Sequence, residues 1–206
     1  MLTLLMLRHG ETEWNAAGRW QGWLDVDLAP LGEQQARARG TTLAASGLAF
    51  SGIVSSDLRR AARTAELIAV HLDGPPVLLD PAWRERHGGE FQGLDVEAID
   101  AGWPGFRDRW RAGLEDAPPG GESDAQVWSR VRASLERRAA DLSNGALLVV
   151  THGGVLRVAL DHAGAPTRSV TPNVGGRWFT WDGEALGAGD PLEPLPDTDH
   201  TKPAIE

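Results

Sequence analysis

Two short runs of apolar residues constrain the fold of this chain more than any other feature. Leu2–Leu7 reads LTLLML, and Ala146–Thr151 reads ALLVVT. Runs of this length without polar alternation are typical of strands buried on both faces, because a half-exposed strand alternates apolar and polar residues. The sheet that contains them must therefore be covered on both sides.

The segments around these runs alternate between strand and helix patterns. Ser123 and Gln126 have the spacing of a capping box, which predicts the start of a helix. The other expected strands are Ile53–Ser55, Val77–Leu79 and Arg177–Trp181. The expected helices are Ala29–Ala45, Asp57–Leu72, Ser123–Asn144 and Val155–Leu160, with two short helices in Asp95–Trp110 broken at 102–105. Alternating strands and helices predict an α/β fold, a three-layer α/β/α sandwich with a mostly parallel central sheet.

The length of 206 residues fits one domain. We expect it to span residues 1–182, with a helical cap-like insertion at about 95–122. Residues 183–206 are proline-rich and acidic, and are expected to be an extended tail. The strand at Arg177–Trp181 could be an edge that pairs in a homodimer, or the tail could cover it.

Composition excludes several kinds of chemistry. The chain has no cysteine, which rules out disulfides, thiolate zinc sites and thiol nucleophiles. Its single lysine is Lys202, so mechanisms that need a lysine are nearly excluded. The net charge of −9 argues against nucleic acid and anionic membranes as partners. No signal-peptide or membrane-span pattern is present, so we expect a cytoplasmic protein.

Both apolar runs end in the same local pattern, His9-Gly10 after the first and His152-Gly153 after the second. The carboxyl ends of parallel strands meet at one edge of a sheet, so we expect the two histidines to lie together, with Arg8 beside them. They could bind zinc, but neither has a third ligand at suitable spacing, and Arg8 would oppose a cation.

Two other features allow more than one interpretation. Asp25-Val26-Asp27 matches the paired aspartates of haloacid-dehalogenase phosphatases, but no apolar strand leads into it, and we expect a turn before the helix. Trp14, Trp20, Trp23 and Trp103 are in predicted loops, where they could either line the mouth of a site or pack in the core.

Four segments, in order along the chain, resemble the motifs of the histidine phosphatase superfamily, the phosphoglycerate-mutase-like proteins. The resemblance extends from Leu4 to about Leu160. The segments are Leu7–Asn15 (LRHGETEWN), Ser56–Ala61 (SDLRRA), Glu85–Gly93 (ERHGGEFQG) and Thr151–Arg157 (THGGVLR).

The resemblance implies a phosphohistidine mechanism that needs no metal and no cofactor. It implies His9 as the nucleophile, His152 and Arg8 as groups that stabilise the phosphate oxygens, and Glu85 as the general acid. The family's second arginine stands immediately before alanine, which selects Arg60 over Arg59. Side chains of adjacent helical residues point about 100° apart, so only one of these two can face the sheet edge.

The resemblance also implies a set of substrate-binding residues. They are Asn15, Gln21, Gly22, Gly153 and, at the rim, His87.

A phosphatase acting on small phosphate monoesters, such as sugar or sugar-acid phosphates, is the expected function. Val54–Ser123 most resembles actinobacterial phosphatases of glucosylated phosphoglycerate, and similar motifs recur in broad-specificity and α-ribazole phosphatases. A cofactor-dependent phosphoglycerate mutase is the alternative, because Glu85-Arg86-His87 resembles the mutase motif. The short stretch between Gly93 and His152 favours the phosphatase. A non-catalytic phospho-ligand binder is a second alternative, disfavoured because no catalytic residue is missing.

Overall fold

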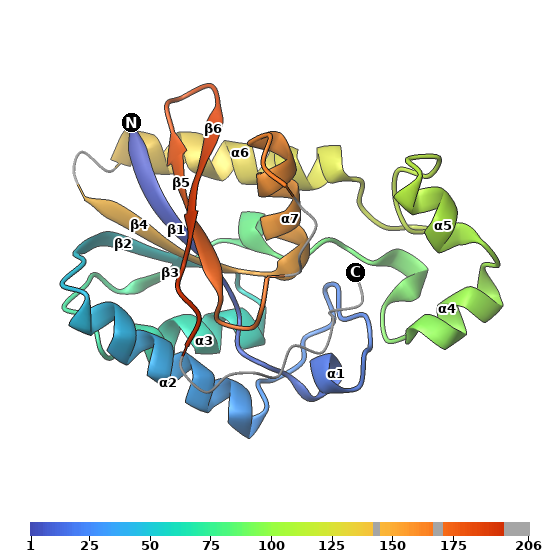
Figure 1. Cartoon of the computed structure of the whole chain (residues 1–206), viewed down its shortest axis with the longest axis horizontal. Coiled ribbons are helices and arrows are strands. Elements are labelled where there is room, and N and C mark those ends of the chain that lie inside the picture. The colour runs from blue at the N-terminus through green and yellow to red at the C-terminus, as the bar shows by residue number, and fades with distance from the viewer. Residues whose placement is uncertain (142–144, 167–170, 196–206) are drawn as a thin grey trace.

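A six-stranded sheet with the strand order β3-β2-β4-β1-β5-β6 forms the centre of the computed structural model, which describes residues 1–141, 145–166 and 171–195 (Figure 1). The strands are β1 (Leu2–Arg8), β2 (Phe50–Ser55), β3 (Val77–Leu79), β4 (Ala146–Thr151), β5 (Gly176–Trp181) and β6 (Leu186–Pro191). The first four are parallel to one another, and β5 and β6 join them as antiparallel strands. The predicted, mostly parallel sheet is confirmed.

Helices cover both faces of this sheet (Figure 1). The α-helices are α1 (Glu13–Ala16), α2 (Pro30–Ala45), α3 (Arg59–Ala69), α4 (Val96–Gly102), α5 (Phe106–Arg111), α6 (Asp124–Asp141) and α7 (Gly153–His162). Two 3-10 helices lie at Pro81–Trp83 and Gly89–Phe91. Because α2 and α3 pack on one face and α6 and α7 on the other, the three-layer sandwich is confirmed. None of the helices described is long and apolar enough to cross a membrane.

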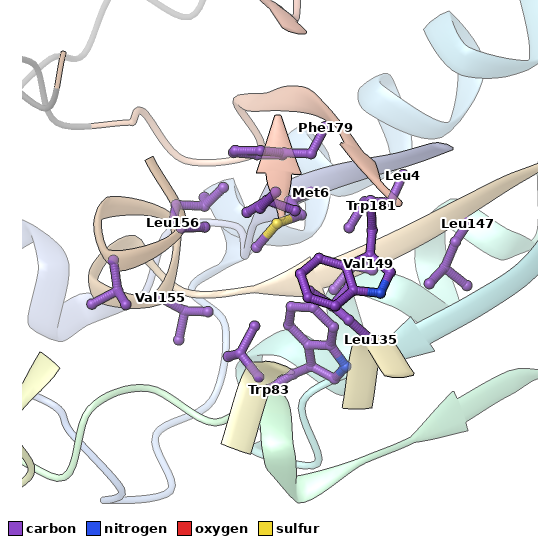
Figure 2. Packing of buried hydrophobic residues seen from close by; sticks show 14 of the residues in the cluster. Leu4, Met6, Trp83, Leu135, Leu147, Val149, Val155, Leu156, Phe179 and Trp181 are labelled. Carbon is purple, nitrogen blue, oxygen red and sulfur yellow. The ribbon is translucent and has the colours of Figure 1, made fainter. Parts of the chain in front are cut away.

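The alternation of side chains along β1 explains why its sequence is apolar throughout. Leu5 and Leu7 pack in a cluster with residues of α2 and α3. Leu4 and Met6 point to the opposite face, where they join Trp83 and residues of α6 and α7 (Figure 2). Strand β4 divides its side chains between the same two clusters. A polar residue at most of these positions would lie in one core or the other.

A third apolar cluster lies apart from the sheet, around the two short helices α4 and α5. This cap cluster consists of the buried side chains of Phe91, Ile99 and Phe106, with Trp20, Leu94, Trp103 and Trp110 packed against them. The helices are separated at residues 103–105, within the break predicted at 102–105, and Gly102 is the last residue of α4.

The structure departs from the sequence prediction at the end of the chain. Leu186–Pro191, placed in the tail, forms β6 and pairs with β5, so the predicted domain boundary at 182 was wrong. Its glycines and proline gave no strand pattern; the open edge of β5 and the burial of Leu186 stabilise this strand instead. Strand β6 thus covers the edge considered for pairing between subunits. Residues 196–206 lie outside the described part of the chain.

Gly40 allows α2 to approach α3 closely, and this contact can be tested. A Cβ atom there would lie 2.7 Å from the His71 Cδ2 atom and 3.1 Å from the Ile68 Cα atom. A glycine-to-alanine change inside a helix usually stabilises a protein by about 0.5–1 kcal/mol. We expect Gly40→Ala instead to lower the free energy of unfolding in urea by about 1–3 kcal/mol, because the helices must move apart.

Gly102→Ala is the control for this measurement. Gly102 ends α4, and a Cβ atom there has nothing within 4 Å. We expect this change to leave stability the same or to raise it slightly. Equal effects of the two substitutions would contradict the close packing of α2 on α3.

Candidate active site

His9 and His152 follow two neighbouring strands and meet at one edge of the sheet. β1 and β4 pair in parallel with Arg8 opposite Thr151, so the next residue of each strand is a histidine. The two imidazole centroids are 5.1 Å apart, and both rings are buried. The predicted meeting of the two histidines is confirmed.

The ring of His9 is held in one tautomer. Its Nδ1 atom lies 2.7 Å from the carbonyl oxygen of Gly10, which can only accept a hydrogen bond. Nδ1 therefore carries the proton, and the lone pair is on Nε2. Burial and the nearby charges of Arg60 and Arg8 hold the pKa of His9 well below its usual value of 6.5. His9 is thus a neutral imidazole, the form that can act as a nucleophile.

His152 is neutral for the same physical reasons, since burial and the charge of Arg60 hold its pKa well below the usual range. Its Nε2 atom lies 2.9 Å from the hydroxyl oxygen of Ser56. That oxygen also accepts the N–H of Leu58, and the hydroxyl can donate its own proton to Nε2. The ring proton then sits on Nδ1, which is buried without a partner among the described residues. Ser56 was not predicted, although it opens the SDLRRA segment.

Arg8 and Arg60 bring two positive charges to the histidines, and Arg60 is 0% exposed. Arg60 donates to the carbonyl oxygens of Gly22 and Leu24, and Arg8 donates to that of Thr171. In the part of the chain described, neither guanidinium has a carboxylate within ion-pair distance. Burial lowers the pKa of Arg60 to about 10, which still leaves it protonated at neutral pH.

Helix α3 turns Arg60 inward and Arg59 outward. The side chain of Arg59 is 57% exposed and pairs with Asp25 and Asp27, in each case at 3.1 Å. Asp25-Val26-Asp27 is therefore an irregular surface segment before α2 that binds Arg59, and the turn lies at residues 22–23 instead of at the predicted position. The selection of Arg60 over Arg59 agrees with the buried position of Arg60 and the exposed position of Arg59.

Glu85 reaches the same edge of the sheet from the segment before the cap cluster. Its Oε2 atom accepts the N–H of Gly154 at 3.1 Å, at the start of α7, and its Oε1 atom accepts the N–H of Arg86 at 2.7 Å. A Cβ atom at position 154 would collide with this carboxylate. Gly154 is thus the residue that lets Glu85 lie against the helix directly after His152.

The predicted substrate-binding residues divide into two groups. Gly22 and Gly153 are joined directly to the histidine–arginine group, the first as an acceptor for Arg60 and the second as the residue after His152. Asn15 uses its Oδ1 atom to cap α1 through Thr12, which leaves its amide N–H groups available.

Gln21 and His87 lie in loops. Gln21 is buried, and its Oε1 atom has no partner among the described residues. The His87 Nδ1 atom accepts the N–H of Gly89, and the imidazole packs against Trp23 with its centroid 5.1 Å from that of the indole.

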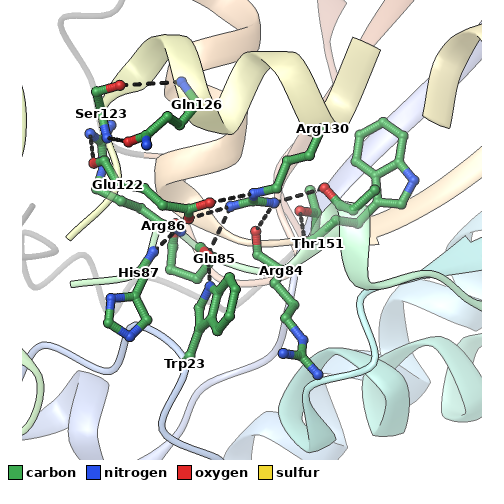
Figure 3. A network of polar contacts seen from close by, with 12 residues as sticks. Trp23, Arg84, Glu85, Arg86, His87, Glu122, Ser123, Gln126, Arg130 and Thr151 are labelled. Carbon is green, nitrogen blue, oxygen red and sulfur yellow. Dashed lines mark hydrogen bonds and ion pairs between the residues drawn. The ribbon is translucent and has the colours of Figure 1, made fainter. Parts of the chain in front are cut away.

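Of the tryptophans considered for the mouth of the site, Trp23 lies beside Glu85. Its indole N–H donates to the carbonyl oxygen of Glu85 at 2.7 Å, and the Arg84 guanidinium lies over its ring (Figure 3). Trp20 and Trp103 instead pack on Phe91 in the cap cluster. The described residues hold no group of three or more His, Asp or Glu side chains suited to a metal ion.

Comparisons with known proteins agree on one family. The model of the histidine phosphatase superfamily (branch 1) matches residues 4–172. A glucosyl-3-phosphoglycerate phosphatase of Mycolicibacterium vanbaalenii is 40% identical over 202 residues, covering 91% of this chain and 87% of the relative. A 2,3-bisphosphoglycerate-dependent phosphoglycerate mutase of Methylobacterium sp. is 37% identical, covering 75% of this chain and 76% of the relative.

A solved structure gives the same result. The mycobacterial glucosyl-3-phosphoglycerate phosphatase in complex with VO3 superposes with a TM-score of 0.81 at 33% identity, over 92% of this chain and 97% of the other.

The neutral, buried histidines predict how stability depends on pH. An unfolded imidazole titrates near pH 6.5, whereas His9 and His152 stay neutral to lower pH when folded. Below about pH 6.5 the unfolded chain therefore binds more protons, and stability falls as the pH falls, by up to about 1.4 kcal/mol per pH unit for each ring. Urea unfolding between pH 7.5 and 5 measures this slope.

We expect His9→Gln and His152→Gln each to flatten the slope, because each removes one of these buried groups. His71→Gln is the control, since His71 is exposed at the end of α3. Slopes that stay the same in both buried-site variants would contradict the neutral state of the two rings.

Proposed function

Because the chain belongs to the histidine phosphatase superfamily and is a phosphatase of small phosphate monoesters, we propose a catalytic group for it consisting of Arg8, His9, Arg60, Glu85 and His152. We also propose that its substrate is a glycosylated sugar-acid phosphate.

The observation that carries this proposal is a set of buried donors without acceptors. The Nε atoms of Arg8 and Arg60 and the Nδ1 atom of His152 are buried and unpaired within the described residues. Leaving one such donor unsatisfied costs about 1–3 kcal/mol, and more for a charged group. A phosphate dianion has the charge and the acceptor oxygens to pair with all of them, and arginine suits phosphate geometry.

In the first step, the lone pair on His9 Nε2 attacks phosphorus. A P–N bond forms, and the bond between phosphorus and the leaving oxygen breaks. Glu85, which acts in this step in its protonated form, gives its carboxyl proton to that oxygen, so the product leaves as an alcohol. Arg8, Arg60 and the Nδ1–H of His152 stabilise the charge on the transferring phosphoryl group.

In the second step, water attacks the phosphohistidine. The Glu85 carboxylate takes a proton from the water, an O–P bond forms, and the P–N bond to His9 breaks. Inorganic phosphate leaves, and His9 returns to its neutral state with Nδ1–H still bonded to Gly10. The cycle therefore restores both the nucleophile and the general acid.

The first test is removal of the nucleophile. The purified protein should release phosphate from 4-nitrophenyl phosphate in the presence of EDTA. We expect His9→Ala to lower the rate by at least about a thousandfold, because no other group can form the intermediate. His71→Ala, a change at an exposed histidine, should leave the rate unchanged. Full turnover by His9→Ala would contradict the assignment, and wild-type inactivity would favour the non-catalytic binder.

The substrate class follows from the position of Trp23 together with the relatives that act on glucosyl-3-phosphoglycerate. The leaving group must lie on the Glu85 side, because Glu85 protonates it. There the indole N–H of Trp23 is hydrogen-bonded to the carbonyl oxygen of Glu85. The side chain is 36% exposed and presents an aromatic surface. Aromatic side chains with a fixed polar edge suit ligands that combine an apolar face with hydroxyl groups, as a sugar ring does.

This substrate proposal predicts a preference that Trp23 controls. We expect kcat/KM for a glucosylated phosphoglycerate to exceed that for phosphoglycerate by at least about tenfold, a 1.4 kcal/mol difference in transition-state binding. Trp23→Ala should bring the ratio towards one. Both esters have alkyl leaving groups, so a general loss of acid catalysis would lower both rates and preserve their ratio. A Trp23→Ala variant that shows this result would contradict a sugar-binding role for Trp23.

A phosphoglycerate mutase is the second candidate, because mutases are also among the relatives. Isomerisation of phosphoglycerate that depends on a bisphosphoglycerate primer would identify this activity. The absence of nucleic-acid and membrane partners, a homodimer and a cytoplasmic location stay predictions from the sequence.

A further inference from the structure

Arg130 of α6 lies against the backbone segment that carries Glu85 (Figure 3). Its Nη1 atom donates to the carbonyl oxygens of Ala82 at 2.7 Å and Arg84 at 2.6 Å. Its Nη2 atom donates to the carbonyl oxygen of Glu85 at 2.9 Å. On its other side, Nε and Nη2 each donate to the Glu122 carboxylate at 3.0 Å.

These contacts use every donor that the side chain has. A guanidinium group carries five N–H groups in one rigid plane, and each has an acceptor here. The ammonium group of a lysine has three donors on a single atom, so it cannot hold three carbonyl oxygens and a carboxylate together. Arg130 therefore fixes the path of the chain from Ala82 to Glu85.

Glu122 extends this support past the general acid. Its Oε2 atom also accepts the N–H of His87 at 2.8 Å, and its own N–H donates to the carbonyl oxygen of His87 at 2.9 Å. The Arg130–Glu122 pair is only 17% exposed on each side. Together the two side chains hold the backbone on both sides of Glu85.

We propose that Arg130, paired with Glu122, is a positioning residue for the general acid. It acts through the backbone of Glu85 and does not touch the substrate, and the inference rests on the role proposed above for Glu85. A general acid must lie about 2.6–3.2 Å from the oxygen that it protonates, and a misplacement of about 1 Å can cost a hundredfold in rate. A flexible Glu85 segment would therefore lose proton transfer while phosphate binding persists.

The test compares two leaving groups with Arg130→Lys, which keeps the positive charge that acts on His152. The alcohol of glycerol 3-phosphate needs a proton to leave, whereas 4-nitrophenolate leaves as a stable anion. We expect kcat/KM for glycerol 3-phosphate to fall by about 10–100-fold, a partial loss that does not exceed the lower end of what general acid catalysis contributes, about a hundredfold. The fall for 4-nitrophenyl phosphate should stay below about threefold.

A double-mutant cycle shows whether Arg130 acts through Glu85. In a Glu85→Gln background there is no acid left to position, so adding Arg130→Lys should cause no further selective loss on the alkyl ester. Arg132→Lys is the matched control, because Arg132 lies on the same helix and pairs with Glu136 at the surface. It should leave both rates unchanged.

Glu122→Gln provides a second variant if Arg130→Lys fails to fold. It removes the carboxylate that accepts hydrogen bonds from Arg130 and from the N–H of His87. The same selective loss is therefore expected. Equal losses on the two esters, or a further selective loss in the Glu85→Gln background, would overturn the positioning role. Wild-type protein that hydrolyses neither ester would instead overturn the proposed function.

Discussion

Arg8 and Arg60 are buried guanidinium groups that have no carboxylate partner among the residues that the structure describes, and the chemistry of the site follows from this. Arg8 and Arg60 are held by the carbonyl oxygens of Gly22, Leu24 and Thr171, which neutralise no charge. Burial, together with the charges of these arginines, lowers the pKa values of His9 and His152 and keeps both imidazoles neutral. A dianionic ligand would relieve this excess of positive charge, and it would meet a neutral nucleophile at the same place. The same two arginines thus favour both the binding of an anion and the neutral form of the nucleophile.

The fold fixes the positions of the catalytic side chains through strand pairing and close backbone contacts. Adjacent parallel strands bring the two histidines together, and Gly154 admits the Glu85 carboxylate at the start of α7. The segment that carries Glu85 has no regular sheet partner, and its carbonyl oxygens bind Arg130 instead. The acid is therefore placed by side-chain contacts, whereas the nucleophile is placed by the sheet.

This difference explains what could be predicted from the sequence. The apolar runs at β1 and β4 and the histidines after them follow from local patterns, whereas the choice of Arg60 over Arg59 came from the resemblance to the family. The capping box of Ser123 and Gln126 is also present, with both of its hydrogen bonds. Ser56 and Arg130 were missed because their importance depends on partners far away in the chain, His152 and the carbonyl oxygens of residues 82–85. Strand β6 was missed because its glycines have little strand preference, and its partner β5 stabilises it.

In the proposed mechanism His9 carries the phosphoryl group between the two steps. The most direct measurement is to mix the protein with a 32P-labelled monoester, quench within one turnover and locate the label by peptide mapping. We expect the label on His9, lost in acid and retained in base, and no label on the His9→Ala variant. Label on another residue, or rapid turnover with no labelled protein at any time, would contradict it.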